Sequence, residues 1–216
     1  MKHRTLILVF LLITFLCFGQ NEHLEPAKDF TQYAGVLKEY YDNVFTLLYS
    51  GFSEKPYARY TSMPSFSAEY AFSVEKIEEK NYIISNKLSE SFWYAGFDKN
   101  GKTVPKQRNK VKVSTIKTEI SNDLYLKIGE LFELLANQTK VYEKDWVGLD
   151  GVTYYFATTD KKGEIKIGET WSPNEKSLLG RLVKICDNLY SVGIGNNIDQ
   201  TRILKEITML INDLTK

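Results

Sequence analysis

Carboxylates close to tryptophan are the side chains of this chain best suited to acid–base chemistry. They lie beside Trp146 or two residues before Trp171. Glycoside hydrolysis uses two carboxylates about 5 to 9.5 Å apart, and acids with aromatic neighbours would suit a sugar site. A carboxylate-dependent glycan hydrolase is therefore one hypothesis for the function. Its candidate acids are Glu143, Asp145, Asp150 and Glu169.

Imidazole chemistry is excluded from the body of the chain. The two histidines are His3, near the N-terminus, and His23, in a segment that we expect to be a flexible leader. Hydrolases with a Ser-His-Asp or Cys-His arrangement need an imidazole to take the proton of the nucleophile. Histidine-ligated zinc sites need one as well.

Cys186 lies beside Ile185, at the edge of an apolar helical stripe. We predict a buried thiol that acts as a small hydrophobe. A reactive nucleophile and pairing with another chain are the alternatives.

No metal or cofactor site is predicted. A calcium loop needs a bidentate glutamate at its twelfth position, but Asn109 is the twelfth residue counted from Asp98. The stretch from Gly193 to Gly195 lacks the third glycine and the preceding strand of a dinucleotide-binding loop. We therefore expect no cofactor.

A second hypothesis is a non-enzymatic domain that binds a protein, a peptide or an envelope ligand through aromatic loops. Binding residues concentrate on loops, and an arginine among aromatic rings can hold a carboxylate or stack on a ring. The alternative is that these side chains only anchor a loop against the sheet. A structural or immunity-type envelope protein is a third hypothesis. The candidate binding residues are Tyr57, Arg59, Tyr60, Glu69, Trp146, Asp150 and Trp171.

The N-terminus has the pattern of a secretory signal peptide over residues 1–19. A basic start precedes an apolar run from Leu6 to Leu16, and small Gly19 precedes polar sequence. A lipoprotein site at Cys17 is disfavoured because the bulky Leu16 precedes it. We therefore expect a periplasmic or secreted protein with no membrane span after signal cleavage. Residues 20–28 are expected to be a flexible leader, and residues 29–216 a single domain.

The charge of the chain argues against nucleic-acid binding. The sequence has 28 Lys and Arg residues and 27 Asp and Glu residues. A nearly neutral chain lacks the basic character that nucleic-acid binding requires. One local basic stretch is interpreted as a solvated loop and strand face, and it contains Lys102, Lys106, Arg108, Lys110 and Lys112.

The periodicity of apolar residues predicts an α+β fold. Helical spacing indicates helices from Phe30 to Gly51 and over 122–137. Strand-like patterns cover 66–74, 81–88, 91–97, 110–120 and 140–146, with 51–65 as an irregular loop. A hairpin joins 152–158 to 164–171 through the turn 160–163. Ser172 is predicted to cap one further helix and Asp199 the last. Short turns between strands imply a mainly antiparallel sheet, with amphipathic helices packed on it and a helical C-terminus.

The segment from Trp146 to Phe156, followed by Thr170 to Pro173, resembles a G-L-D-G-x-x-Y…W-S-P pattern of uncharacterised exported bacterial proteins. The similarity covers residues 146–175. It implies a shared hairpin-to-helix unit, and no activity comes with it.

Overall fold

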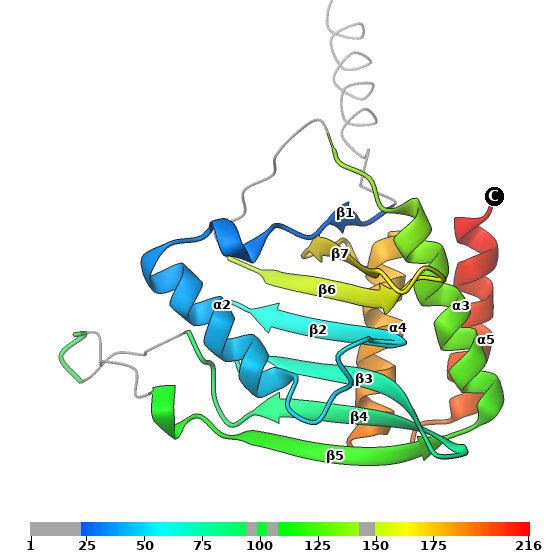
Figure 1. Ribbon diagram of the computed structural model, residues 1–216, viewed down its shortest axis with the longest axis horizontal. Helices are drawn as coiled ribbons and strands as arrows, with labels where there is room; N and C mark the ends of the chain where they lie inside the picture. Colours follow the sequence, from blue (N-terminus) through cyan, green and yellow to red (C-terminus); the bar gives the residue numbers. More distant parts are fainter. Residues whose placement is uncertain (1–22, 94–98, 103–107, 143–149) are drawn as a thin grey trace, which may run out of the picture.

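A computed structural model describes residues 23–93, 99–102, 108–142 and 150–216. Its centre is a seven-stranded sheet with the strand order β1-β7-β6-β2-β3-β4-β5, in which all neighbouring strands are antiparallel (Figure 1). The strands are β1 (Glu25–Pro26), β2 (Ala58–Pro64), β3 (Tyr70–Ile77), β4 (Lys80–Leu88), β5 (Val113–Ile120), β6 (Val152–Thr159) and β7 (Ile165–Trp171).

Four α-helices cover the two faces of this sheet unequally. Three of them pack on one face, and one crosses the other face (Figure 1). The helix on the second face is α2 (Gly35–Leu48), and the three on the first are α3 (Asn122–Gln138), α4 (Leu178–Gly193) and α5 (Gln200–Leu214). The predicted α+β class with a mainly antiparallel sheet is confirmed.

The larger core lies between the sheet and the three-helix layer. Alternate residues of the central strands enter it, among them Tyr60, Phe72 and Ile83. They meet helix stripes with spacings of three and four, as in Leu124, Ile128, Leu131 and Leu135 of α3. Residues at a spacing of two share one face of a strand, and residues at spacings of three and four share one face of a helix. The apolar residues of the sheet and of the helices therefore face each other.

A smaller core lies between α2 and the opposite face of the sheet. Val44 and Leu48 of the helix are fully buried there, against Met63, Ala71 and Leu88 of the strands. Asn86 of β4 reaches the end of the helix, where its Nδ2 donates to the carbonyl oxygens of Leu48 and Ser50, at 2.8 and 2.9 Å. Because the last carbonyls of a helix lack partners within it, this amide fixes where α2 ends.

The segment 51–65, expected to be an irregular loop, contains the central strand β2. Six of its seven residues are buried, so the strand lacks the alternation of buried and exposed residues that marks a half-buried strand. A strand covered on both faces has no period-two pattern, and Pro56 before the strand and Pro64 at its end resemble loop boundaries. The neighbouring strand also begins later than expected, at Tyr70, and exposed Phe66 lies outside it.

The helix expected to be capped by Ser172 is capped by Ser177 instead, five residues later, and begins at Leu178. Ser177 Oγ accepts from Gly180 N at 3.0 Å. Ser172 instead has a φ of +36°, and its Oγ accepts from Val152 N at 2.8 Å. It therefore fastens the end of the hairpin. Asp199 caps α5 as predicted, through Thr201 N.

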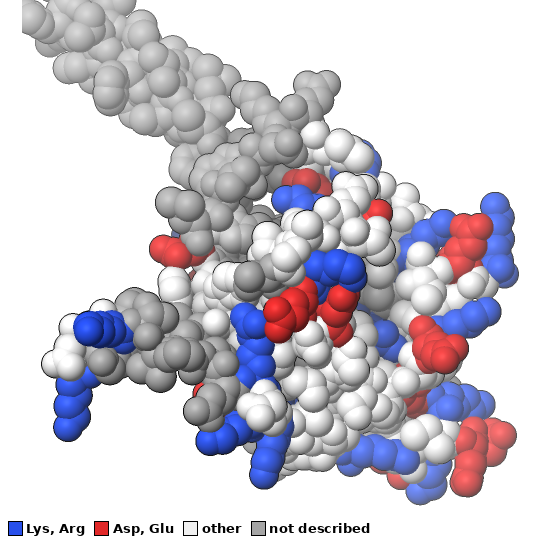
Figure 2. Space-filling model, turned by 60° about the vertical axis from the view of Figure 1, so that its left-hand side comes forward, with Lys and Arg blue, Asp and Glu red and all other residues white. Residues whose placement is uncertain are grey.

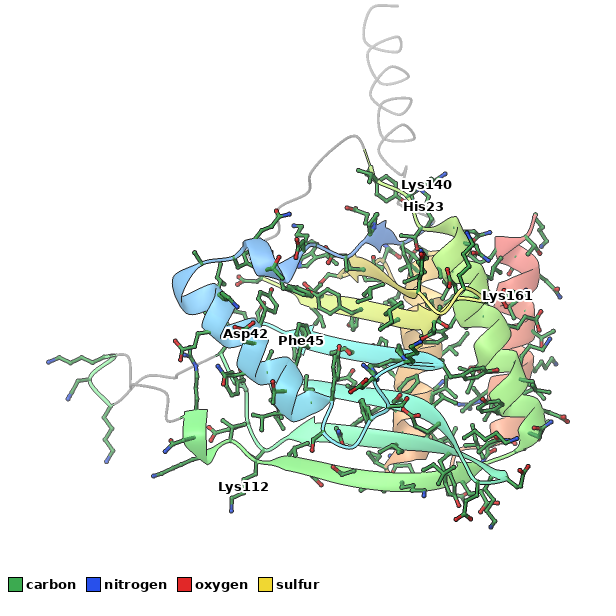
Figure 3. All side chains as sticks on the ribbon, in the orientation of Figure 1. His23, Asp42, Phe45, Lys112, Lys140 and Lys161 are labelled. Carbon is green, nitrogen blue, oxygen red and sulfur yellow. The ribbon has the colours of Figure 1, made fainter. Side chains whose placement is uncertain are left out.

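The residues 23–28, assigned by sequence to a flexible leader, lie against the sheet. β1 pairs with β7, and Leu24 is buried beneath it. The His23 ring stacks on Tyr142 with 4.2 Å between centroids, close to Lys140 (Figure 3). The predicted signal peptide lies outside the described residues, as do most of the strands expected at 91–97 and 140–146. In the described part of the chain, no helix has the length and apolar character to cross a membrane.

Candidate ligand-binding site

The residues predicted to form a binding loop are divided between the two faces of the sheet. Arg59 and Tyr60 are consecutive strand residues, so their side chains point in opposite directions. Tyr60 enters the three-helix side, whereas Arg59 and Glu69 face α2. Tyr57 precedes the strand and packs on α3. The structure therefore does not bring these four residues together in one site.

Arg59 anchors the loop that follows α2. Its guanidinium lies 4.5 Å from the ring centroid of Tyr49 and 5.3 Å from that of Phe52, and it donates to the carbonyl oxygen of Ser53. Glu75 binds the same loop, because it accepts from the backbone N and the Oγ of Ser53 at 3.1 and 2.7 Å. These contacts agree with the anchoring interpretation of Arg59.

Glu69 is a fully buried carboxylate beneath the first half of α2. It accepts a hydrogen bond from Tyr40 Oη at 3.0 Å and one from the backbone N of Phe92 at 2.8 Å. Burial raises the pKa of Glu69, and these donors only partly offset the effect. The carboxylate thus joins α2 to the chain at Phe92.

Tyr60 takes part in a second buried carboxylate centre, on the three-helix side. Tyr60 and Tyr70 both donate to Oδ1 of Asp187, at 2.9 and 2.8 Å. Burial raises the pKa of Asp187, and the two phenols lower it by a smaller amount. The centre connects α4 to β2 and β3.

Tyr57 lies in a shallow groove of about 350 Å³ between α3 and the β6–β7 hairpin. Its ring stacks on Tyr125 at 4.2 Å, and burial raises its pKa to about 12. A Cβ at Gly129 would lie 1.9 Å from Tyr57 Oη, so glycine is needed for this contact. Glu133 and Lys161 form an ion pair at 2.9 Å on the rim.

The carboxylates proposed for glycan hydrolysis do not form a close pair in the described part of the chain. Glu143, Asp145 and Trp146 lie outside it. Asp150 is exposed, five residues before the partner of Glu169 in β6, which corresponds to about 16 Å of extended chain. Trp171 is half-buried at the end of β7 and packs near Gly151.

Glu69, which is buried on the α2 side, is also too distant from Glu169 for a catalytic pair. Glu69 immediately precedes β3 and Glu169 is in β7, with two strands between them. Three strand spacings correspond to about 14 Å, which exceeds the separation in either class of glycosidase.

Because several acids are buried, we expect the free energy of unfolding to decrease as the pH rises. Burial raises the pKa of Glu69, Glu169 and Asp187 in the folded protein. The folded state therefore binds more protons than the unfolded state above the ordinary carboxyl pKa, and this contribution is lost as the pH rises through the raised values. We expect a higher urea midpoint at about pH 5 than at about pH 7.

Asp187→Asn tests the source of this pH dependence. Facing Asp187 are Tyr60, Tyr70, Tyr154 and Cys186, and none of these ionises in this pH range, because burial raises the pKa of each. The variant should show a smaller decrease between the two pH values. A wild-type midpoint that rises from about pH 5 to about pH 7 would contradict the assignment.

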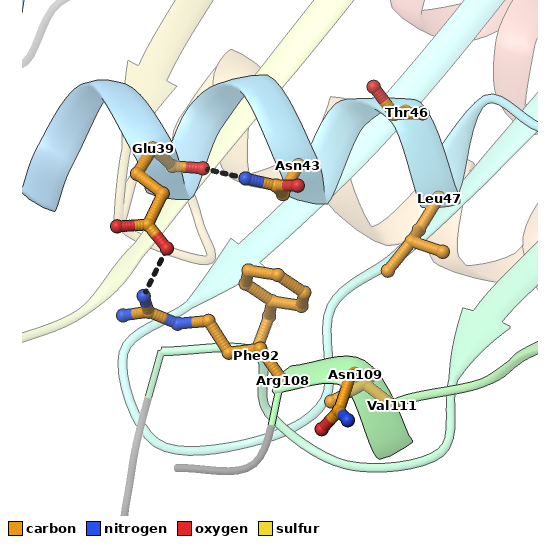
Figure 4. A pocket seen from close by; sticks show the side chains of 8 residues that line it. All are labelled: Glu39, Asn43, Thr46, Leu47, Phe92, Arg108, Asn109 and Val111. Carbon is orange, nitrogen blue, oxygen red and sulfur yellow. Dashed lines mark hydrogen bonds and ion pairs between the residues drawn. The ribbon is translucent and has the colours of Figure 1, made fainter. Parts of the chain in front are cut away.

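A groove between α2 and the short helix η2 (Arg108–Lys110) combines an apolar floor with polar walls. Its volume is about 340 Å³, within the usual range of small-ligand sites. Leu47, Phe92 and Val111 supply its apolar surface (Figure 4). Its polar lining consists of Glu39, Asn43, Thr46, Arg108 and Asn109. We call these eight residues the α2–η2 groove.

Arg108 is the central charged group of the α2–η2 groove. Its guanidinium lies 5.7 Å from the ring centroid of Phe92, and its Nη1 donates to Glu39 at 3.3 Å (Figure 4). The Arg108 side chain is 26% exposed and that of Glu39 is 61% exposed. Arg108 Nε is buried and has no hydrogen-bond partner among the described residues. The guanidinium therefore lies against a ring, while about a quarter of the side chain stays accessible from the groove.

The surroundings of the α2–η2 groove are basic. Residues 99–112 contain six Lys and Arg residues and no Asp or Glu. Figure 2 shows blue side chains gathered beside the grey segments, on the side of the molecule that carries α2. Elsewhere on α2, outside the groove lining, Asp42 is paired with Lys38 at 2.6 Å. This distribution favours an anionic ligand.

A row of stacked rings holds α2 in position on the side away from the groove. Neighbouring centroids in this aromatic row are 5.3 to 6.0 Å apart, and Phe45 projects from the last turn of the helix (Figure 3). Stacked aromatic pairs add to the stability that burial provides. The row therefore holds α2 rigidly as one side of the α2–η2 groove. The rings of the row are Tyr33, Tyr41, Phe45, Tyr49 and Phe52.

Cys186 and His23, the cysteine and the histidine considered for chemistry, have packing roles in the structure. Cys186 is fully buried in the larger core, and burial raises the pKa of its thiol. His23 packs on Tyr142, as described above. Within the described ranges, no three His, Cys, Asp or Glu side chains are grouped so that they could hold a metal ion. Comparisons with protein-family models, curated proteins and solved structures find no match to this chain.

Proposed function

We propose that the chain is an exported binding domain that takes an acidic segment of a protein or peptide in the α2–η2 groove. The observation that carries this proposal is Arg108, whose guanidinium lies over Phe92 in the lining of the groove and whose side chain is still 26% exposed. Export rests on the signal-peptide pattern of residues 1–19. No catalytic role is assigned.

The composition of the groove supports a peptide rather than a free anion. Asn43 and Asn109 lie on its two walls, and amide side chains can donate to and accept from a peptide backbone. The floor of Leu47 and Val111 suits an apolar side chain of the ligand. Arg108 supplies a planar pair of donors for a neighbouring carboxylate.

Replacing Glu39 should change the ligand affinity in the opposite direction to replacing Arg108. It is the acid that Arg108 contacts in the described structure, so a ligand carboxylate would displace it or share the guanidinium with it. Its exposure allows it to turn toward water. Removal of its charge should therefore strengthen binding, whereas removal of the Arg108 charge should weaken it.

The experiment uses fluorescein-labelled peptides of alternating glutamate and leucine, and of alternating lysine and leucine, in fluorescence anisotropy. We expect the glutamate peptide to bind more tightly than the lysine peptide. Arg108→Gln should raise its Kd at least about tenfold, the equivalent of one charge-assisted hydrogen bond. Glu39→Gln should lower the Kd.

The matched control is Arg202→Gln on α5, because Arg202 is an exposed arginine that is also paired with a glutamate, at 3.5 Å. Its Kd should equal that of the wild type. Equal binding of the two peptides, or equal losses in Arg108→Gln and Arg202→Gln, would disprove the proposal.

A further inference from the structure

β5 forms one edge of the sheet, and its outer side has no strand partner among the described residues. Eight residues of this strand pair with β4 on the inner side. Exposed edges of this length commonly carry charges that block further pairing. Here the charged side chains lean back onto β4 instead: Lys117 Nζ lies 3.8 Å from the ring centroid of Tyr82, and Glu119 pairs with Lys80 at 2.8 Å.

We infer that a second copy of this chain pairs with the protein through β5, antiparallel and edge to edge, with the twofold axis at Thr118. The two sheets then form one continuous sheet. This surface is separate from the α2–η2 groove, and the inference does not depend on the proposed function.

The charges of β5 select this register. In antiparallel pairing, opposite residues share a face of the sheet, so the twofold axis of a symmetric pair must lie at a residue. An axis at Lys117 or at Glu119 would place two like charges directly opposite each other, which is destabilising. An axis at Thr118 places Lys117 opposite Glu119 of the second copy, and this pair occurs twice.

The other face of the strand is complementary in the same register. Ile116, which is 40% exposed, would lie opposite Ile120 of the second copy, and this pair also occurs twice. An axis at Ile116 would place Lys117 opposite Thr115, without an opposite charge. Both faces therefore favour the axis at Thr118.

Among the described residues, the neighbouring elements limit the pairing but do not add a strand to this edge. β5 forms the lower rim of the molecule in Figure 1, with α3 and α5 at one end. Thr118 Oγ1 donates to the carbonyl oxygen of Gly193 at 2.9 Å, which places the end of α4 on one face of the sheet. Ser121 N donates to Gln200 Oε1, so the paired segment ends at Ile120.

Sedimentation equilibrium and cysteine cross-linking test the inference. We expect the protein to sediment as a dimer at high concentration. Thr118→Cys should form a disulfide-linked dimer under oxidising conditions, because opposite Cα atoms in antiparallel strands are about 4.5 to 5.5 Å apart. Ile116→Cys should not, because Ile120 faces it. Cys186 is buried and cannot contribute to the cross-link.

Ile116→Lys should raise the dimer Kd at least about tenfold. Its control is Ile165→Lys, since Ile165 is a similarly exposed isoleucine on β7, far from β5 in the sheet. A monomer at every soluble concentration would overturn the inference. A cross-link through Ile116→Cys in place of Thr118→Cys would also overturn it.

Discussion

Phe72→Ala should lower the free energy of unfolding by about 3 to 5 kcal/mol. Phe72 is fully buried in the middle of the larger core, and its ring centroid lies 5.5 Å from that of Tyr60. The truncated side chain leaves a cavity between the sheet and the helices, and the rigid strands cannot close it. Urea denaturation followed by circular dichroism measures the change.

The matched control for Phe72 is Phe66→Ala. Phe66 is 61% exposed and lies outside the strands. Its replacement should change the free energy of unfolding by less than about 0.5 kcal/mol, as is usual for surface positions. Similar losses for the two variants would contradict the cavity at Phe72 as the source of the destabilisation.

Arg59→Ala should lower the free energy of unfolding by about 3 kcal/mol, the sum expected from a charged hydrogen bond and the contacts with two rings. The substitution removes the donor to the Ser53 carbonyl oxygen and uncovers Tyr49 and Phe52. The loop after α2 would lose its attachment to β2. Thermal and urea denaturation report the loss.

Arg59→Lys distinguishes the guanidinium from its charge. Lysine keeps the charge but lacks the planar group that lies over the rings of Tyr49 and Phe52, so it should restore less than half of the lost stability. Arg202→Ala, at an exposed arginine with an ion pair, should have an effect below about 1 kcal/mol. An Arg59→Ala variant as stable as the wild type would show that the loop is held by other contacts.

The elements with one buried face could be predicted from sequence. The stripe of Leu124, Ile128 and Leu131 correctly indicated α3, and the turn at Gly163 correctly indicated the β6–β7 hairpin. β2 could not be found in this way, because burial of both of its faces removes the alternation. The separation of Arg59 from Tyr60 was missed for the same reason.

The groove could not be predicted because its walls are distant in sequence. Asn43 and Leu47 belong to α2, whereas Arg108 and Val111 follow some sixty residues later. The available signal was the spacing of Glu39, Asn43 and Leu47, which places them along one side of a helix. Sequence alone does not say which segment faces that side, so the basic residues near Arg108 resembled an ordinary solvated loop.

The most direct test of the proposed function is a nuclear magnetic resonance titration of the ¹⁵N-labelled protein with the glutamate–leucine peptide. We expect the largest amide shift changes to cluster at Asn43, Leu47, Asn109 and Val111, and Arg108→Gln to require at least about tenfold more peptide to reach them. Shift changes that are absent from these residues, or that persist unchanged in Arg108→Gln, would contradict the proposal.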